Sequence, residues 1–136
     1  MASVKRFEEL QVWQLSRDLN KIIGELIDKN IFNKNYRIIN QIEGSSGSIM
    51  DNIAEGFERG TKGEFIQFLG YSKGSCGELR SQLYRAKDRG YINQEQFNEL
   101  ANIAIRISAM IFKLISYLQV SAIQGNRKKT FRPLDS

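Results

Sequence analysis

Histidine is absent from this chain of 136 residues, and cysteine and proline each occur once. Without histidine, the sequence cannot form Ser-His or Cys-His nucleophile pairs, or supply the imidazole ligands of most zinc and non-haem iron sites. A single cysteine cannot close a disulfide within the chain, and the charged N-terminal segment lacks the apolar stretch of a signal peptide. We therefore expect a cytoplasmic protein without a histidine-based catalytic or metal site.

Apolar residues recur at spacings of three and four along four stretches, a pattern typical of amphipathic helices, and no strand-like alternation competes with it. The sequence predicts helices over about 7–27, 36–57, 61–89 and 93–124, with short polar breaks between them. Short connections favour an all-α fold, an antiparallel up-down-up-down four-helix bundle. We assign residues 1–125 to this bundle and residues 126–136 to a basic tail.

The last two predicted helices have recognisable ends. The segments Thr61–Glu64 and Asn93–Gln96 are typical of helix N-termini, in which side chains satisfy free backbone N–H groups. Gly90 follows the third helix, where a left-handed residue commonly ends the last turn.

The second and third predicted helices are rich in glycine and serine where they would face each other. A hairpin centred near Gly60 brings Ser45–Ser48 opposite about Tyr71–Gly74. Small residues cost helix propensity, and a close approach of the two backbones would offset that cost. We therefore predict close packing there, with Cys76 as a small core residue rather than a reactive thiol.

The fourth predicted helix has more apolar surface than one bundle can cover. Arg106 and Lys113 are its only charges between Leu100 and Gln124. A membrane span would bury both charges, so we expect no membrane contact. A second buried surface is the better explanation and predicts a homo-oligomer. The expected interface residues lie on a further face of this helix: Ile105, Phe112 and Ile123.

Positive charge gathers beside the core-facing seam of the third helix. The chain has a net charge of +5; Lys73, Arg80 and Lys87 recur every seven residues, and Arg85 and Arg89 lie nearby. Repeated by the symmetry of an oligomer, this stripe would form a positive ring that binds RNA or DNA through phosphates, with little sequence preference. The alternative is a flank that pairs with carboxylates on neighbouring helices.

The tail holds a second group of positive charges, Arg127, Lys128 and Lys129. These residues offer contacts to phosphate. A solvated, disordered terminus is the more ordinary interpretation of such a segment.

Acidic residues offer one further candidate site. Glu55, Glu58 and Glu64 lie near the second turn, where a carboxylate-only metal site is conceivable, although solvated charges are the more ordinary explanation. The neighbouring glycines lack the spacing and the strand of a phosphate loop. We predict no cofactor, no metal site and no catalytic residue.

Three stretches together resemble a known family. Phe7–Gln14 resembles its opening motif, Ser48–Arg59 resembles its S-I-x-x-N-I-A-E-G-x-x-R motif, and Phe65–Leu83 resembles its third-helix pattern. Over about residues 7–118, the chain is similar to the four-helix bundle family of 23S rRNA intervening-sequence proteins. The resemblance implies an up-down bundle, assembly as a homopentamer and no established catalytic residue. A related bundle, which accompanies the reverse transcriptase of diversity-generating retroelements, binds nucleic acid through a basic surface.

Three residues that match the family motif, Asn52, Glu55 and Arg59, share one helical face. We interpret them as structural anchors of the second turn rather than as a binding patch, because Asn52 and Glu55 lie next to core positions, where polar groups need partners. Relatives usually carry basic residues just before the motif, whereas this chain has Glu43 followed by small residues. Nucleic-acid contacts that relatives make there are therefore not expected here.

These observations favour a non-enzymatic, oligomeric bundle that binds RNA or another nucleic acid nonspecifically through the third helix and the tail. The alternative is a scaffold or accessory protein that recruits a protein partner, with the basic residues only adding solubility.

Overall fold

The computed structural model describes residues 4–124, with side chains up to residue 121. Within this part the fold is all-α, as predicted, and no strand occurs. A short 3-10 helix, η1 (Phe7–Glu9), precedes α1 (Gln11–Asp28), α2 (Tyr36–Glu58), α3 (Lys62–Asp88) and α4 (Gln94–Gln124). The predicted tail, 126–136, lies outside the described residues.

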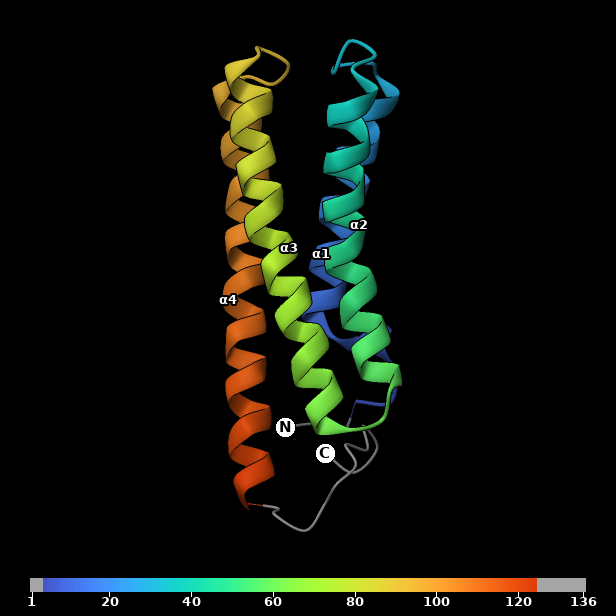
Figure 1. Cartoon of the computed structure of the whole chain (residues 1–136), viewed down its shortest axis with the longest axis vertical. Helices are drawn as coiled ribbons and strands as arrows, with labels where there is room; N and C mark the ends of the chain where they lie inside the picture. Colours follow the sequence, from blue (N-terminus) through green and yellow to red (C-terminus); the bar gives the residue numbers. More distant parts are fainter. Residues whose placement is uncertain (1–3, 125–136) are drawn as a thin grey trace.

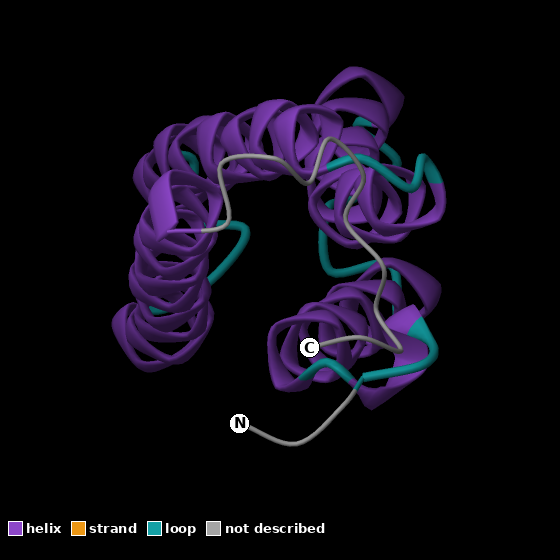
Figure 2. Ribbon diagram, turned by 90° about the horizontal axis from the view of Figure 1, so that it is seen from below, coloured by secondary structure: helices purple, strands orange, loops and turns teal. Residues whose placement is uncertain are grey.

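The four helices form a bundle in which consecutive helices run in opposite directions (Figure 1). Each helix packs against the next along the chain, and α1 also contacts α4. Viewed from below, the helices surround a shared interior (Figure 2). The interior is largely apolar, because every helix turns its three-four repeat inward.

The predicted seam of α3 is confirmed, since its residues are all buried: Phe65, Leu69, Ser72, Cys76, Leu79, Leu83 and Ala86. The other helices contribute fully buried aliphatic residues, including Leu19, Ile23, Ile42, Ile49, Ile53, Leu100 and Ile107. Each such side chain contributes roughly 1.5–3 kcal/mol when it leaves water. Burial of these side chains therefore provides the main driving force for the bundle.

The predicted helix ends are also confirmed. Thr61 Oγ1 accepts a hydrogen bond from the Glu64 backbone N–H at 3.2 Å. Asn93 and Gln96 form a reciprocal pair, in which each side chain accepts from the other residue's backbone N–H, at 2.7 and 2.9 Å. Gly90 takes the left-handed conformation expected of it, with φ of 78°.

The expected close packing of small residues is only partly right. Gly44, Gly70, Gly74 and Gly77 have open space where a Cβ atom would lie. The physical reason is helix rotation: these glycines are turned away from the α2–α3 contact, and serines occupy the inward positions. The close approach occurs instead at Gly56, where a Cβ atom would lie 2.6 Å from Phe68 Cβ.

Serine side chains form a polar seam between α2 and α3. Ser45 Oγ donates to Gln82 Oε1 at 2.6 Å, and Ser72 Oγ donates to the Ile49 carbonyl at 2.7 Å. Ser48 contacts Ser75 at 3.1 Å, four residues beyond the predicted Tyr71, whereas Ser72 contacts Ile49, two residues beyond the predicted Gly47. Among the described residues, no buried side-chain nitrogen or oxygen lacks a partner.

The connection between α1 and α2 is unusual, because three residues other than glycine adopt left-handed backbone. They are Asn30, Asn33 and Lys34, with φ of 55°, 51° and 58°. Asn30 Oδ1 stabilises the connection by accepting from the Lys34 backbone N–H at 3.1 Å. The connection delivers Asn35 to the start of α2, where its side chain accepts from the Ile38 N–H at 3.3 Å.

Candidate nucleic-acid interface

The basic residues of α3 divide between two flanks of the helix. Lys87 faces α4: its ammonium lies 3.4 Å from Gln94 Oε1 and 4.5 Å from the centre of the Phe97 ring. Lys73 and Arg80 share this flank, because residues seven apart lie on one side of a helix. Arg85 faces α2, where it donates to Gln41 Oε1 at 2.8 Å. The predicted stripe is therefore two separate patches.

No carboxylate neutralises either patch within the described residues. The ion pairs found there both use Arg59, which contacts Glu55 at 2.9 Å and Glu64 at 3.3 Å. The basic residues of α3 are thus left with charge that can act on an external anion. The basic residues of the tail, Arg127, Lys128 and Lys129, lie outside the described residues.

One end of the bundle contains a hollow lined by several arginines. It lies between the start of α2 and the end of α3 and has a volume of about 320 Å³. Its lining residues are Asn35, Arg37, Ile38, Arg85, Asp88 and Arg89. Sequence analysis anticipated Arg85 and Arg89 as basic residues but missed Arg37. No periodic signal connects Arg37 with α3, because only folding brings the two segments together.

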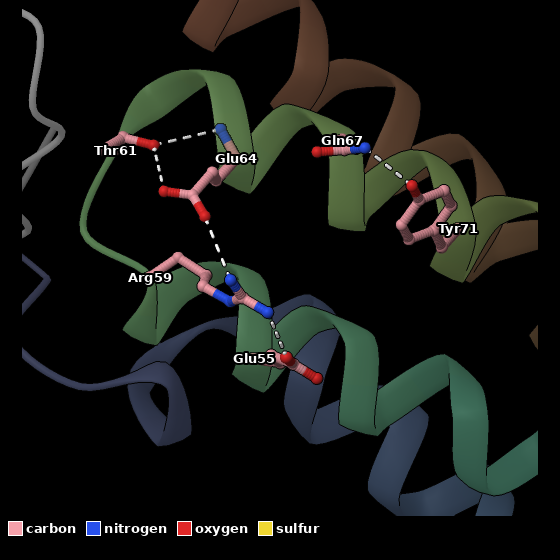
Figure 3. Close-up of polar contacts among 6 residues, drawn as sticks. All are labelled: Glu55, Arg59, Thr61, Glu64, Gln67 and Tyr71. Carbon is pink, nitrogen blue, oxygen red and sulfur yellow. Dashed lines mark hydrogen bonds and ion pairs between the residues drawn. The ribbon is translucent and has the colours of Figure 1, made fainter.

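Two of the motif residues form a polar cluster at the second turn (Figure 3). Arg59 bridges Glu55 on α2 and Glu64 on α3, and its guanidinium lies 4.9 Å from the centre of the Phe68 ring. The hydrogen bond with Glu55 is the main cause of a raised pKa for Arg59. Glu64 also accepts from the Thr61 hydroxyl at 2.9 Å. The arrangement joins the end of α2 to the start of α3.

Asn52, the third motif residue, lies outside this cluster. Its side-chain amide donates to the Ser48 carbonyl and the Ser48 hydroxyl, both at 2.8 Å. Because Ser48 also contacts Ser75 on α3, Asn52 supports the polar seam rather than the turn.

The candidate carboxylate site is not assembled in the described part of the chain. No group of three potential metal-ligating residues occurs there. Glu55 and Glu64 are instead engaged by Arg59.

The outer face of α4 is apolar and exposed. Ile105 is 49% exposed, Phe112 is 62% exposed, and Val120, which continues the same face, is 52% exposed. Ile123 belongs to the last turn of α4, but its side chain lies outside the described residues. By length and composition alone, Gln94–Ser121 is apolar enough to cross a membrane, a property that core helices of soluble proteins also show.

The sequence profile of the 23S rRNA-intervening sequence proteins matches residues 8–113. The chain belongs to this family. Its fold is similar to that of a crystal structure from Bacteroides thetaiotaomicron, described as a protein with unknown function from the S23 ribosomal protein family. The TM-score is 0.72 at 24% identity, over 76% of this chain and 97% of the other. No match was found among the curated proteins. Neither description names an enzymatic activity.

Proposed function

We propose that this 23S rRNA-intervening sequence protein is a non-enzymatic, oligomeric bundle that binds RNA or another nucleic acid through the basic residues of α3. The main supporting observation is that the candidate basic residues have no carboxylate partner among the described residues. They are Lys73, Arg80, Arg85 and Lys87 of α3, and Arg89 directly after it. Carboxylate pairing was the alternative explanation of these charges. Lysine and arginine free of such pairing can neutralise phosphates and release the counterions bound to them.

The spacing of the α3 residues supports nonspecific recognition. Lys73, Arg80 and Lys87 lie along one flank at intervals of two helical turns, or about 10.5 Å. Contacts from such a row to phosphates would position a nucleic acid without reading its base edges. The tail residues Arg127, Lys128 and Lys129 add charge beyond the described part.

Self-association would multiply these contacts. The exposed apolar face of α4, with Ile105 and Phe112, supports a contact with a second copy of the chain, and the family resemblance favours a pentamer. Cyclic repetition of α3 would then present several equivalent basic flanks to one polyanion.

Titration of a structured RNA at about 50 mM and about 200 mM salt tests this function. Three phosphate contacts, with a salt slope of about −0.7 to −0.9 each, predict a loss of affinity of about 20- to 40-fold between the two conditions. The triple variant K73E/R80E/K87E should abolish binding while keeping the helical circular dichroism of the wild type. A matched control, K5E/K21E/K29E, makes the same charge change at exposed positions on the α1 side.

Two results would count against the proposal. Absence of binding at low salt would remove nucleic acid as the ligand. An equal loss of RNA affinity in both triple variants would mean that the net charge of the protein, and not the basic residues of α3, governs binding. The exposed α4 face would then favour the second candidate function, a scaffold for a protein partner, because apolar surface of this kind also suits a partner helix.

A further inference from the structure

The arginine-lined hollow between α2 and α3 has a more defined geometry than either basic flank. Arg37 comes from the first turn of α2, Arg85 comes from the last turn of α3, and Arg89 directly follows that helix. At about 320 Å³ the hollow lies at the lower end of the usual range for ligand pockets, about 300–1,000 Å³. The space suits a small anionic group.

Two of the three guanidinium groups, those of Arg85 and Arg89, are held in place without being neutralised. Arg85 donates to the amide oxygen of Gln41 at 2.8 Å. Arg89 reaches the Tyr91 hydroxyl at 3.5 Å, with its guanidinium 5.6 Å from the centre of the Tyr91 ring. These partners are neutral and each bonds one donor, whereas a guanidinium carries five N–H donors in a fixed fork. Most of the donor capacity therefore remains for a ligand.

The tyrosine that positions Arg89 is itself fixed by the α1–α2 connection. Asn35 donates to the Tyr91 hydroxyl at 3.1 Å, and Phe32 packs edge-on against the Tyr91 ring. The left-handed residues Asn33 and Lys34 lead directly into Asn35. The backbone of the connection thus helps to organise the hollow before any ligand arrives.

The charges around the hollow favour a dianion. Three arginines and Asp88 give the lining a net charge of +2. Asp88 forms no ion pair with these arginines in the described part of the chain. A phosphate monoester carries about −1.5 to −2 charges at pH 7, whereas a backbone phosphodiester carries one. The partial positive charge at the start of α2 and the partial negative charge at the end of α3 oppose each other at this edge, so the three arginines determine the sign of the local charge.

We propose that Arg37, Arg85 and Arg89 form a binding site for a phosphate monoester, and that its occupant is the phosphorylated end of a nucleic-acid strand. The identity of the strand rests on the proposed function; the site for a phosphate monoester does not. Arginine forms bidentate hydrogen bonds to phosphate oxygens. A terminal phosphate has three free oxygens and more negative charge than a diester, which has two, so it can pair with more of the three arginines at once.

The test compares one short RNA carrying a 5′-phosphate with the same RNA carrying a 5′-hydroxyl, and adds calorimetry with inorganic phosphate. The wild type should bind the phosphorylated RNA at least about tenfold more tightly, the contribution of one charge-assisted contact. In the double variant R37Q/R85Q this ratio should fall to about one, and the heat of phosphate binding should disappear. The control K21Q/K29Q removes the same charge at two exposed positions, one in α1 and one directly after it. It should keep both the preference for the phosphorylated RNA and the heat of phosphate binding.

The outcomes separate this site from the proposed function. If both RNAs bind with salt-dependent affinity but without preference, and phosphate gives no heat, the site is overturned and the function stands. If phosphate binds and R37Q/R85Q abolishes that binding while neither RNA binds, the site stands with a small phosphate ester as its occupant, and the function fails. A preference retained in R37Q/R85Q would overturn the assignment to these arginines.

Discussion

Gly56 on α2 and Phe68 on α3 approach so closely that a Cβ atom on Gly56 would lie 2.6 Å from Phe68 Cβ and 3.2 Å from a ring carbon of Phe65. Both obstacles are anchored near the α3 backbone, and Phe65 is buried, so neither can move far. The contact therefore fixes the distance between the two helices next to their turn.

The first prediction concerns this contact. Gly56→Ala should lower the free energy of unfolding by about 1–3 kcal/mol, because the added methyl group overpacks the α2–α3 contact. Chemical denaturation followed by circular dichroism measures the change. Gly44→Ala on the same helix meets open space and should instead raise stability, by up to about 1 kcal/mol, through helix propensity. Equal effects of the two substitutions would contradict the close approach.

The second prediction concerns the buried pair of Ser45 and Gln82. Ser45→Ala leaves the Gln82 side-chain oxygen without its partner and should cost about 1–3 kcal/mol of unfolding free energy. The double variant S45A/Q82L removes both polar groups and should recover part of that loss. Denaturation of the single and double variants gives their coupling energy. Ser81→Ala, at an exposed neighbouring position, should be close to neutral. If the losses of stability from Ser45→Ala and Gln82→Leu simply add in the double variant, the hydrogen bond between Ser45 and Gln82 is contradicted.

The third prediction concerns Cys76, whose thiol is fully buried in the seam of α3. Burial raises the pKa of Cys76 from 9.0 to about 12, and the nearby Lys73 and Arg80 only partly oppose this. The folded thiol should therefore stay protonated and unreactive toward disulfide reagents at pH 8. Rapid labelling of the folded protein would contradict this burial.

The same shift makes stability depend on pH. Between pH 9.0 and about 12 the unfolded chain loses a proton that the folded chain retains, so the unfolding free energy contributed by Cys76 is present below pH 9 and falls as the pH rises. The full shift corresponds to roughly 4 kcal/mol. Because other groups titrate in this range, the measurement is the difference in pH dependence between the wild type and Cys76→Ala, which should lose less stability.

The fourth prediction concerns assembly. Phe112→Asp places a charge on the exposed apolar face of α4 and should convert the proposed oligomer to a monomer without loss of helix content. Light scattering and sedimentation measure the mass. Phe112→Leu keeps the face apolar and should keep the oligomer. A wild-type monomer at micromolar concentration would contradict self-association, and binding of the wild type to lipid vesicles would direct the α4 face to a membrane instead.

Sequence periodicity was sufficient to predict where the helices lie and which of their faces point inward, as the fully buried seam of α3 shows. The same periodicity places Gly44 and Gly74 on the outward faces of their helices. The prediction of one small-residue patch did not separate these outward glycines from the inward serines. Helical periodicity also explains why the basic residues of α3 form two patches, since it points Lys87 toward α4 and Arg85 toward α2. The meeting of Arg37 with Arg85 had no local signal, because it depends on how α2 and α3 are placed together.

The serine contacts between α2 and α3 have a mechanical consequence. Aliphatic side chains alone would tolerate a slide of one helix along the other, since one apolar contact replaces another at modest cost. Here a slide would break the hydrogen bonds from Ser45 to Gln82 and from Ser72 to the Ile49 carbonyl. The two hydroxyls would then be buried without partners, which is costly. The α2–α3 pair should therefore move as one rigid body when the protein binds a ligand or another copy of itself.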